Sequence, residues 1–170
     1  SHAFKSPITG LRLFTVYGPW MRPDMALGIF TRAILEEKPL EVFNFGRMRR
    51  DFIYIDDLAD AVVKVLDQAP AQNAGRGEPA RGEAPHRIYN IGNNKPVDLL
   101  SFIAMLESEL GRRAVKNLLP MPAGEAPVTC ADITSLHSAI GFVPRVSLPE
   151  GLSRYVDWYR SYYRHASSGC

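Results

Sequence analysis

The sequence predicts an α/β fold, because segments with the composition of buried strands alternate with segments that have the apolar spacing of helices. The first strand signal is the apolar, aromatic and β-branched run Gly10–Val16, which stops at the turn signal Gly18-Pro19. The first helix signal follows over about 25–38, where apolar residues recur on one face. The same alternation continues through the rest of the chain, so we expect strands in a sheet covered by helices.

Each later element is bounded by a turn residue or by a capping side chain. In the first half we expect the helix to end before Pro39, then a strand over 40–45 closed by Gly46, a basic turn over 47–50, a strand over 51–55, and a helix that Asp56 or Asp57 caps. In the second half we expect a strand over 87–92, a helix that starts after Asp98 and stops at Gly111, a strand over 115–119, a short helix from Asp132 to about Gly141, and a last helix opened by the capping-box pattern Ser147–Glu150.

Between these halves, residues 69–86 change character. Glycine and proline alternate there with Ala, Glu and Arg, and large apolar side chains are missing until the next strand. Such a segment cannot bury enough surface to offset its ordering entropy, so we expect a mobile surface loop. The chain as a whole, residues 1–170, has the length of a single domain.

Composition excludes several classes of protein. The chain is 46% hydrophobic and 22% charged, which is typical of a folded soluble domain. Its net charge of +2 comes from bases spread along the chain, which argues against nucleic-acid binding. No apolar run approaches the ~18 residues of a membrane span. Cys130 and Cys170 are too few for a disulfide framework or a cysteine metal site, so we expect a reduced, cytoplasmic domain.

Thr15 and Arg22 stand seven residues apart across the Tyr17-Gly18-Pro19 turn. Thr15 ends its predicted strand, and the carboxyl ends of strands are where α/β sheets usually place ligands. The guanidinium of Arg22 can bind a carboxylate or a phosphate through two parallel hydrogen bonds. Spacing alone favours the plainer alternative, in which Thr15 is an ordinary strand residue and Arg22 is a solvated loop cation paired with Asp24.

A second candidate is the basic segment Gly46–Phe52. Its three arginines follow a glycine and make a local positive patch that suits a diphosphate. The alternative is a solvated basic turn, with Arg50 and Asp51 on opposite faces of the following strand. The residues alone leave these two interpretations equally open.

Groups that could perform catalysis are not found. The pair Asp56-Asp57 is explained better as a helix cap than as an acid–base pair. The four histidines share no metal-ligand spacing and no nearby nucleophile pattern. A Tyr-x-x-x-Lys pair is absent, as are the glycine-rich loops Gly-x-Gly-x-x-Gly and Gly-x-x-x-x-Gly-Lys. We therefore expect groups that bind a ligand, without catalytic residues and without a metal.

Three stretches, Leu11–Met25, Arg50–Asp57 and Tyr89–Asn93, occur in the order of three landmarks of the extended short-chain dehydrogenase/reductases. More narrowly, they resemble the UDP-glucuronate 4-epimerases, a branch that is often encoded with capsular polysaccharide genes. The resemblance continues through the segments Ala131–Ile133, Gly141–Pro144 and Glu150–Leu152. It implies the C-terminal, substrate-binding part of an extended Rossmann-type enzyme, with the N-terminal dinucleotide-binding domain missing.

The resemblance also implies a reaction. The intact enzyme would interconvert UDP-glucuronate and UDP-galacturonate through a 4-keto intermediate, with NAD as hydride carrier and the tyrosine of Tyr-x-x-x-Lys as base. In this part, Thr15 would lie near the sugar carboxylate with Arg22 beside the sugar, and Arg50 would meet the pyrophosphate. Leu13 and Phe14 would pass close to the nicotinamide. Alone, this part would be inactive and would bind no NAD, and the intact enzyme would be a homodimer.

Other functions share this scaffold. Thr15 stands where relatives that use neutral sugars often have Asn, which favours the uronate branch. Met21 and Glu125 stand where Gly and Asp are common in that branch. Nucleotide-sugar dehydratases and decarboxylases remain alternatives. So does a non-catalytic binding or assembly module, for which the tyrosine-rich last helix would provide a contact surface.

Overall fold

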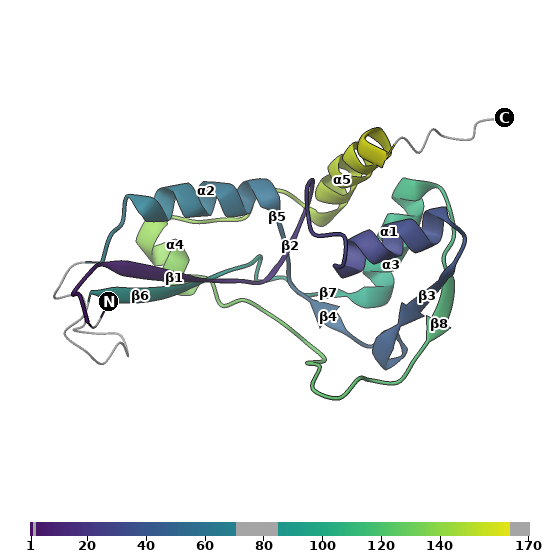
Figure 1. Cartoon of the computed structure of the whole chain (residues 1–170), viewed down its shortest axis with the longest axis horizontal. Helices are drawn as coiled ribbons and strands as arrows, with labels where there is room; N and C mark the ends of the chain where they lie inside the picture. Colours follow the sequence, from purple (N-terminus) through teal and green to yellow (C-terminus); the bar gives the residue numbers. More distant parts are fainter. Residues whose placement is uncertain (2, 71–84, 164–170) are drawn as a thin grey trace.

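The computed structural model describes residues 1, 3–70 and 85–163, and it has the mixed α/β architecture that the sequence predicts (Figure 1). In chain order its elements are β1 (Ile8–Leu13), β2 (Thr15–Tyr17), α1 (Ala26–Leu35), β3 (Pro39–Val42), the 3₁₀ turn η1 (Phe43–Gly46), β4 (Arg49–Arg50), β5 (Phe52–Tyr54), α2 (Ile55–Leu66), β6 (His86–Ile91), β7 (Val97–Asp98), α3 (Leu99–Leu110), β8 (Val115–Leu118), α4 (Thr134–Ile140) and α5 (Leu148–Tyr163).

The strands pair mostly in parallel. β1 pairs with β6, β2 with β5 and β3 with β8 in parallel, while the short β4 and β7 are antiparallel. The predicted first strand is in fact two strands that change partner between Phe14 and Thr15. The Phe14 N–H donates to the carbonyl of Ile91, and the next N–H, of Thr15, donates to that of Asp51. This change of partner carries the chain from one lobe of the molecule to the other (Figure 1).

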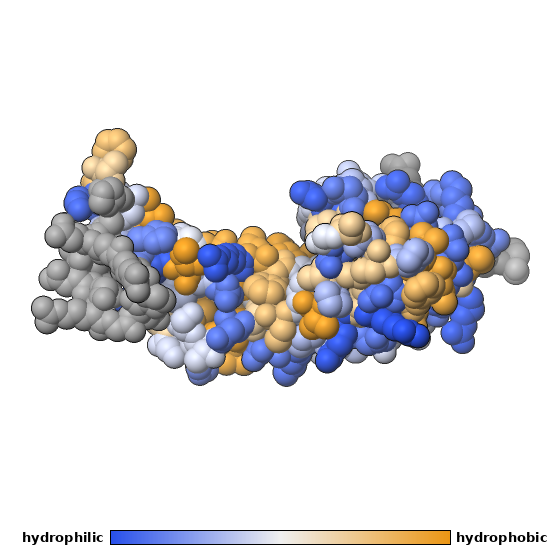
Figure 2. Space-filling view, turned by 90° about the horizontal axis from the view of Figure 1, so that it is seen from below, coloured by the Kyte–Doolittle hydropathy of each residue, from blue (hydrophilic) through white to orange (hydrophobic). Residues whose placement is uncertain are grey.

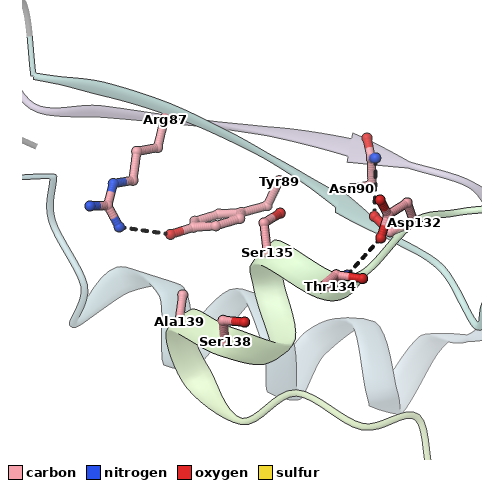
Figure 3. A pocket seen from close by; sticks show the side chains of 8 residues that line it. All are labelled: Arg87, Tyr89, Asn90, Asp132, Thr134, Ser135, Ser138 and Ala139. Carbon is pink, nitrogen blue, oxygen red and sulfur yellow. Dashed lines mark hydrogen bonds between the residues drawn. The ribbon is translucent and has the colours of Figure 1, made fainter. Parts of the chain in front are cut away.

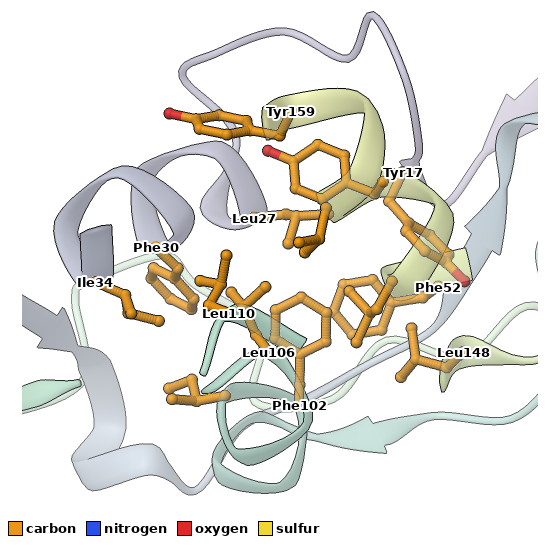
Figure 4. Close-up of a cluster of buried hydrophobic side chains, with 14 of the residues drawn as sticks. Tyr17, Leu27, Phe30, Ile34, Phe52, Phe102, Leu106, Leu110, Leu148 and Tyr159 are labelled. Carbon is orange, nitrogen blue, oxygen red and sulfur yellow. The ribbon is translucent and has the colours of Figure 1, made fainter. Parts of the chain in front are cut away.

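Two hydrophobic cores fill the lobes. The larger core lies among β2, β3, β5, α1, α3 and α5, and Figure 4 shows its aromatic centre. There the rings of Phe52 and Phe102 stack with centroids 4.5 Å apart, and Tyr17 meets Phe52 edge to face. The smaller core lies between α2, α4 and the β1–β6 pair, around Tyr89 and Ile91. The site described below lies beside the larger core.

A glycine allows α5 to pack closely on the larger core. A Cβ at Gly151 would collide with the ring and the hydroxyl of Tyr17, which is itself buried. Any larger residue would push the first turn of α5 away from the sheet. Gly151 therefore fixes how closely the last helix approaches β2.

Three local predictions are wrong. Helix α1 ends at Leu35 rather than at Lys38, because Glu37 takes a left-handed conformation with φ 55°. The strand after it ends at Val42, and the chain then turns through η1. The predicted basic turn contains the short strand β4, in which Arg49 and Arg50 pair with β7.

The prediction for the cap of α2 is also wrong. Tyr54 is its N-cap residue, and both aspartates lie in the first helical turn, where negative charge complements the helix dipole. The Asp57 side chain is buried and accepts hydrogen bonds from the backbone N–H groups of Arg145 and Val146, at 3.0 and 2.9 Å. Asp57 is thus an anchor for the segment that leads into α5.

Other caps are confirmed. Asp98 Oδ2 accepts from the Ser101 N–H at the start of α3, and Gly111 ends that helix in the left-handed region. Helix α4 starts at Thr134 with Ile133 as its N-cap, two residues after the predicted start at Asp132, whose Oδ1 accepts from the N–H of Thr134. Most of the predicted loop over 69–86 lies outside the described residues, except that His86 already belongs to β6.

The β1–β6 pair is covered on one face only within the described part of the chain. Leu11 and Tyr89 face the helices of the smaller core, whereas Ile8 and Ile88 on the opposite face are more than 40% exposed. Figure 2 views the molecule from below and shows apolar surface along its middle. Among the described helices, none is long and apolar enough to cross a membrane.

Two buried tyrosines make the fold sensitive to alkaline pH. Burial raises the pKa of Tyr155 to about 12, and burial also raises the pKa of Tyr17 strongly. Both folded-state pKa values exceed that of an unfolded tyrosine, which is about 10. The folded state therefore keeps its full stability below about pH 10 and loses it as the pH rises from there toward the folded-state pKa values. We expect the free energy of unfolding, measured by urea titration, to fall from about pH 10 to pH 12. Tyr155→Phe should reduce this slope, and an unchanged slope would contradict the assignment.

Candidate functional site

A groove of about 720 Å³ opens beside the larger core, among α1, β3, β4 and the start of α3. Its apolar lining includes Phe30, Leu40 and Phe102, whose side chains also belong to the core. Its polar lining residues are Thr15, Asp24, Glu41, Arg50 and Glu125. An apolar groove with a few polar groups is the usual form of a site for a small organic ligand.

Strand pairing fixes Thr15 at the groove. Thr15 is opposite Phe52 in the β2–β5 pair, and its N–H donates to the carbonyl of Asp51 at 3.1 Å. The backbone is thereby held, while the half-buried side chain reaches the groove. The structure thus places Thr15 at the groove, but at the start of β2 and not at the end of its strand as predicted, because the chain changes strand partner just before it. The role of Thr15 toward a ligand stays a prediction.

Arg50 is the cation of the groove. Its side chain is 19% exposed, and Nη1 donates to the carbonyl of Ala126 at 2.8 Å. Nη2 donates to the carboxylate of Glu125 at 3.2 Å, and this carboxylate is 55% exposed. Since carbonyls hold one side of the guanidinium and a movable carboxylate meets the other, Arg50 is positioned to bind an anion that replaces Glu125.

Arg22 does not line this groove. Its Nε and Nη2 atoms donate to the two carboxylate oxygens of Asp24 at 3.1 and 3.0 Å, and its side chain is 74% exposed. This is the solvated pair that spacing favoured. Asp24 itself reaches the groove, so the pair stands at its edge. A sugar contact for Arg22 stays a prediction.

Leu13 and Phe14 also lie outside the groove lining. Leu13 ends β1 with half of its side chain exposed, and Phe14 is half-buried where the chain changes strand partner. Their proximity to a nicotinamide ring stays a prediction.

A second hollow, of about 480 Å³, lies between β6 and α4 (Figure 3). Several of its polar groups already bond to one another. Arg87 Nη1 donates to the hydroxyl of Tyr89 at 3.3 Å, and Asn90 Nδ2 donates to the carbonyl of Asp132 at 3.2 Å. Among the described residues, no group of three or more His, Cys, Asp or Glu side chains could hold a metal ion. The groove at Arg50 is therefore the candidate site.

Comparison with known proteins decides the family. The model of the NAD dependent epimerase/dehydratase family matches residues 1–92, which is more than half of the chain. The chain belongs to the NAD-dependent epimerase/dehydratase family. Thr15 and Arg50, which line the groove, both fall inside the matched residues.

Within this family, the chain is similar to several curated proteins, one of which is a probable UDP-glucuronate 4-epimerase. It is 43% identical to a probable UDP-glucuronate 4-epimerase of Rhizobium meliloti, covering 98% of this chain and 50% of that protein. It is 42% identical to the CapI protein of Staphylococcus aureus, covering 96% of this chain and 50% of that protein. The chain thus spans about half the length of these curated relatives.

A solved structure supports the same assignment. The UDP-glucuronic acid 4-epimerase of Bacillus cereus, crystallised with UDP-glucuronic acid and NAD, is 37% identical and matches with a TM-score of 0.79. The match covers 95% of this chain and 48% of that chain. The fold of this member of the NAD-dependent epimerase/dehydratase family therefore matches about half of the Bacillus cereus enzyme.

Sequence reasoning missed two parts of the site in this epimerase/dehydratase family member. The carbonyls of Ala126 and Pro127 hold Arg50 from a segment about 75 residues away. The sequence predicted only that Asp51 lies on the opposite face of its strand from Arg50, and not that its carboxylate is buried. The available sign that Asp51 has buried partners was its place directly before the apolar strand signal Phe52–Tyr54.

Proposed function

We propose that this chain is the sugar-nucleotide-binding part of an NAD-dependent UDP-glucuronate 4-epimerase, which interconverts UDP-glucuronate and UDP-galacturonate through a 4-keto sugar. The observation that carries the proposal is the half-buried Arg50 guanidinium at an apolar groove, with one side held and the other facing a displaceable carboxylate. A diphosphate offers the oxygens that such a guanidinium binds best.

The rest of the groove supports a uronate-bearing ligand. Thr15 provides a hydroxyl at the start of β2, suited to hydrogen-bond a sugar carboxylate. Arg22 stands at the edge of the groove and can exchange Asp24 for a ligand carboxylate, since both side chains of that pair are largely exposed. Under this proposal Arg50 binds the diphosphate and Thr15 binds the sugar end.

The chain also offers a contact for NAD. Leu13 carries a half-exposed apolar side chain at the carboxyl end of β1, a chemistry that fits one face of a nicotinamide ring, and Phe14 follows it. When bound, NAD supplies the hydride transfer at C4 that the epimerisation requires. The glycine-rich loop for its diphosphate is not in this sequence. The free thiol of Cys130 supports a reducing, cytoplasmic compartment.

A reconstituted enzyme tests this function. We expect the chain, joined to the N-terminal half of the Rhizobium meliloti relative, to convert UDP-glucuronate to UDP-galacturonate with NAD, and the chain alone to be inactive. The control is the same fusion with the tyrosine of the Tyr-x-x-x-Lys motif of the added half changed to phenylalanine. Turnover by the chain alone, or failure of the fusion on every UDP-uronate, would overturn the proposal. A product lighter by carbon dioxide or water would identify a decarboxylase or a dehydratase.

A second candidate is a non-catalytic assembly module. The aromatic cluster of Trp20, Trp158 and Tyr162 favours it, because Trp20 is 73% exposed and its ring lies 4.9 Å from that of Tyr162. Light scattering and calorimetry separate the candidates. Self-association without heat from UDP supports the module. We also propose that the intact enzyme is a homodimer, so light scattering of the reconstituted protein should give twice its monomer mass.

A further inference from the structure

Asp51 is a fully buried carboxylate next to Arg50. Its oxygens accept hydrogen bonds from three backbone N–H groups. Oδ1 accepts from Asn93 at 3.0 Å, and Oδ2 accepts from Asn94 at 3.0 Å and from Ala131 at 2.8 Å. A buried carboxylate is costly unless such donors satisfy it. Through these bonds the Asp51 side chain joins two segments that are far apart in the sequence, at 93–94 and at 131.

The packing around this carboxylate is close. A Cβ at Gly92 would lie 2.8 Å from Asp51 Oδ2 and would collide with the side chain of Ala131. Glycine is therefore required where β6 ends, so that the turn at 93–94 can reach the carboxylate. The N–H of Asp51 also donates to the hydroxyl of Thr129 at 3.4 Å.

The segment 126–131 that Asp51 holds at one end also holds Arg50 at the other. The carbonyl of Ala126 accepts from Arg50 Nη1, and the backbone of Arg49 exchanges hydrogen bonds with Pro127 and Thr129, at 2.9 and 3.1 Å. The hydrogen bond that the Ala131 N–H donates to Asp51 thus helps to hold the segment whose carbonyls orient the guanidinium.

We propose that Asp51 is a positioning residue for the diphosphate of the ligand: it holds segment 126–131 so that Arg50 faces the groove. This inference rests on the proposed function, in which Arg50 binds the diphosphate. Asp51→Asn keeps the size but turns one acceptor into an NH₂ donor, which has to face an N–H group. The one remaining oxygen is uncharged and cannot accept from all three N–H groups as the carboxylate does, so segment 126–131 is held less firmly and Arg50 loses its fixed orientation.

Asp57 provides a matched control, because it is a second buried carboxylate that accepts backbone N–H groups and it lies outside the groove lining. Both Asp51→Asn and Asp57→Asn should lower the melting temperature. Calorimetry at a temperature where each is folded should show UDP binding weakened ~10-fold in Asp51→Asn alone, with uridine binding unchanged in both. A purely structural role would leave the ratio of UDP to uridine affinity unchanged in Asp51→Asn, and this result would overturn the inference.

A second measurement needs no ligand. The guanidinium N–H signals of Arg50, assigned by comparison with Arg50→Lys, should be resolved in the NMR spectrum of the wild type and of Asp57→Asn, and averaged in Asp51→Asn. If Asp51→Asn does not fold, Asp51→Ser decides, since its single short hydroxyl cannot accept from all three N–H groups that the carboxylate binds; changed Arg50 signals support the inference and unchanged signals overturn it. A wild type with resolved signals that fails to bind UDP would contradict the proposed function and not the positioning role.

Discussion

Replacing Arg50 with alanine is expected to weaken UDP binding by roughly 30-fold or more, which corresponds to at least about 2 kcal/mol. The guanidinium is half-buried and already held by the carbonyl of Ala126, so a diphosphate finds a preorganised pair of donors that alanine removes. Isothermal titration calorimetry at fixed ionic strength measures the effect.

Two controls show whether UDP affinity depends on the position of the Arg50 charge or only on the total positive charge of the segment. Arg47→Ala removes an exposed arginine from the same basic segment and should leave UDP affinity within about twofold. Uridine, which lacks phosphates, should bind equally to Arg50→Ala and to the wild type. Equal losses of UDP affinity in Arg47→Ala and Arg50→Ala would show that general charge, and not the groove, binds the ligand.

Replacing Phe102 with alanine is expected to destabilise the fold by about 3–5 kcal/mol. Its side chain is fully buried, its ring stacks on Phe52 at 4.5 Å, and it forms part of the groove lining, so the change leaves a cavity and removes an aromatic pair. Urea denaturation at neutral pH measures the free energy of unfolding.

The comparison for this variant is Leu66→Ala at the end of α2, where the side chain is 74% exposed. It should change the free energy of unfolding by about 0.5 kcal/mol or less. A loss below about 1 kcal/mol in Phe102→Ala would mean that the aromatic centre of the larger core does not pack as described.

Features set by neighbouring residues could be predicted from the sequence. The start of α3 depends on Asp98 and Ser101, and its end on Gly111, all close together in the chain. The ion pair of Arg22 with Asp24 is equally local. The sequence favoured this solvated pair over a ligand-binding role for Arg22, and the structure contains the pair. The family resemblance also rested on short continuous segments, which can be recognised in the sequence without knowledge of the fold, and it is confirmed.

Features set by distant residues could not be predicted. Arg112 donates to the carbonyl of Leu35 at 2.8 Å, so the end of α1 depends on a residue beyond α3, and periodicity over 25–38 could not reveal it. The end of the first strand at Leu13 depends on a change of partner from β6 to β5. The role of Asp51 depends on donors that are 42 to 80 residues away.

The ion pair between Arg50 and Glu125 has a consequence for selectivity under the proposed function. The Glu125 carboxylate neutralises the guanidinium before any nucleotide arrives, so binding exchanges one anion for another. The net attraction therefore depends on how much more strongly the ligand interacts with the guanidinium than the carboxylate does. A nucleoside monophosphate offers the oxygens of a single phosphate in this exchange, whereas a diphosphate offers a second set of oxygens to the donors that Glu125 releases. The internal counter-ion thus makes the groove discriminate by the number of phosphates.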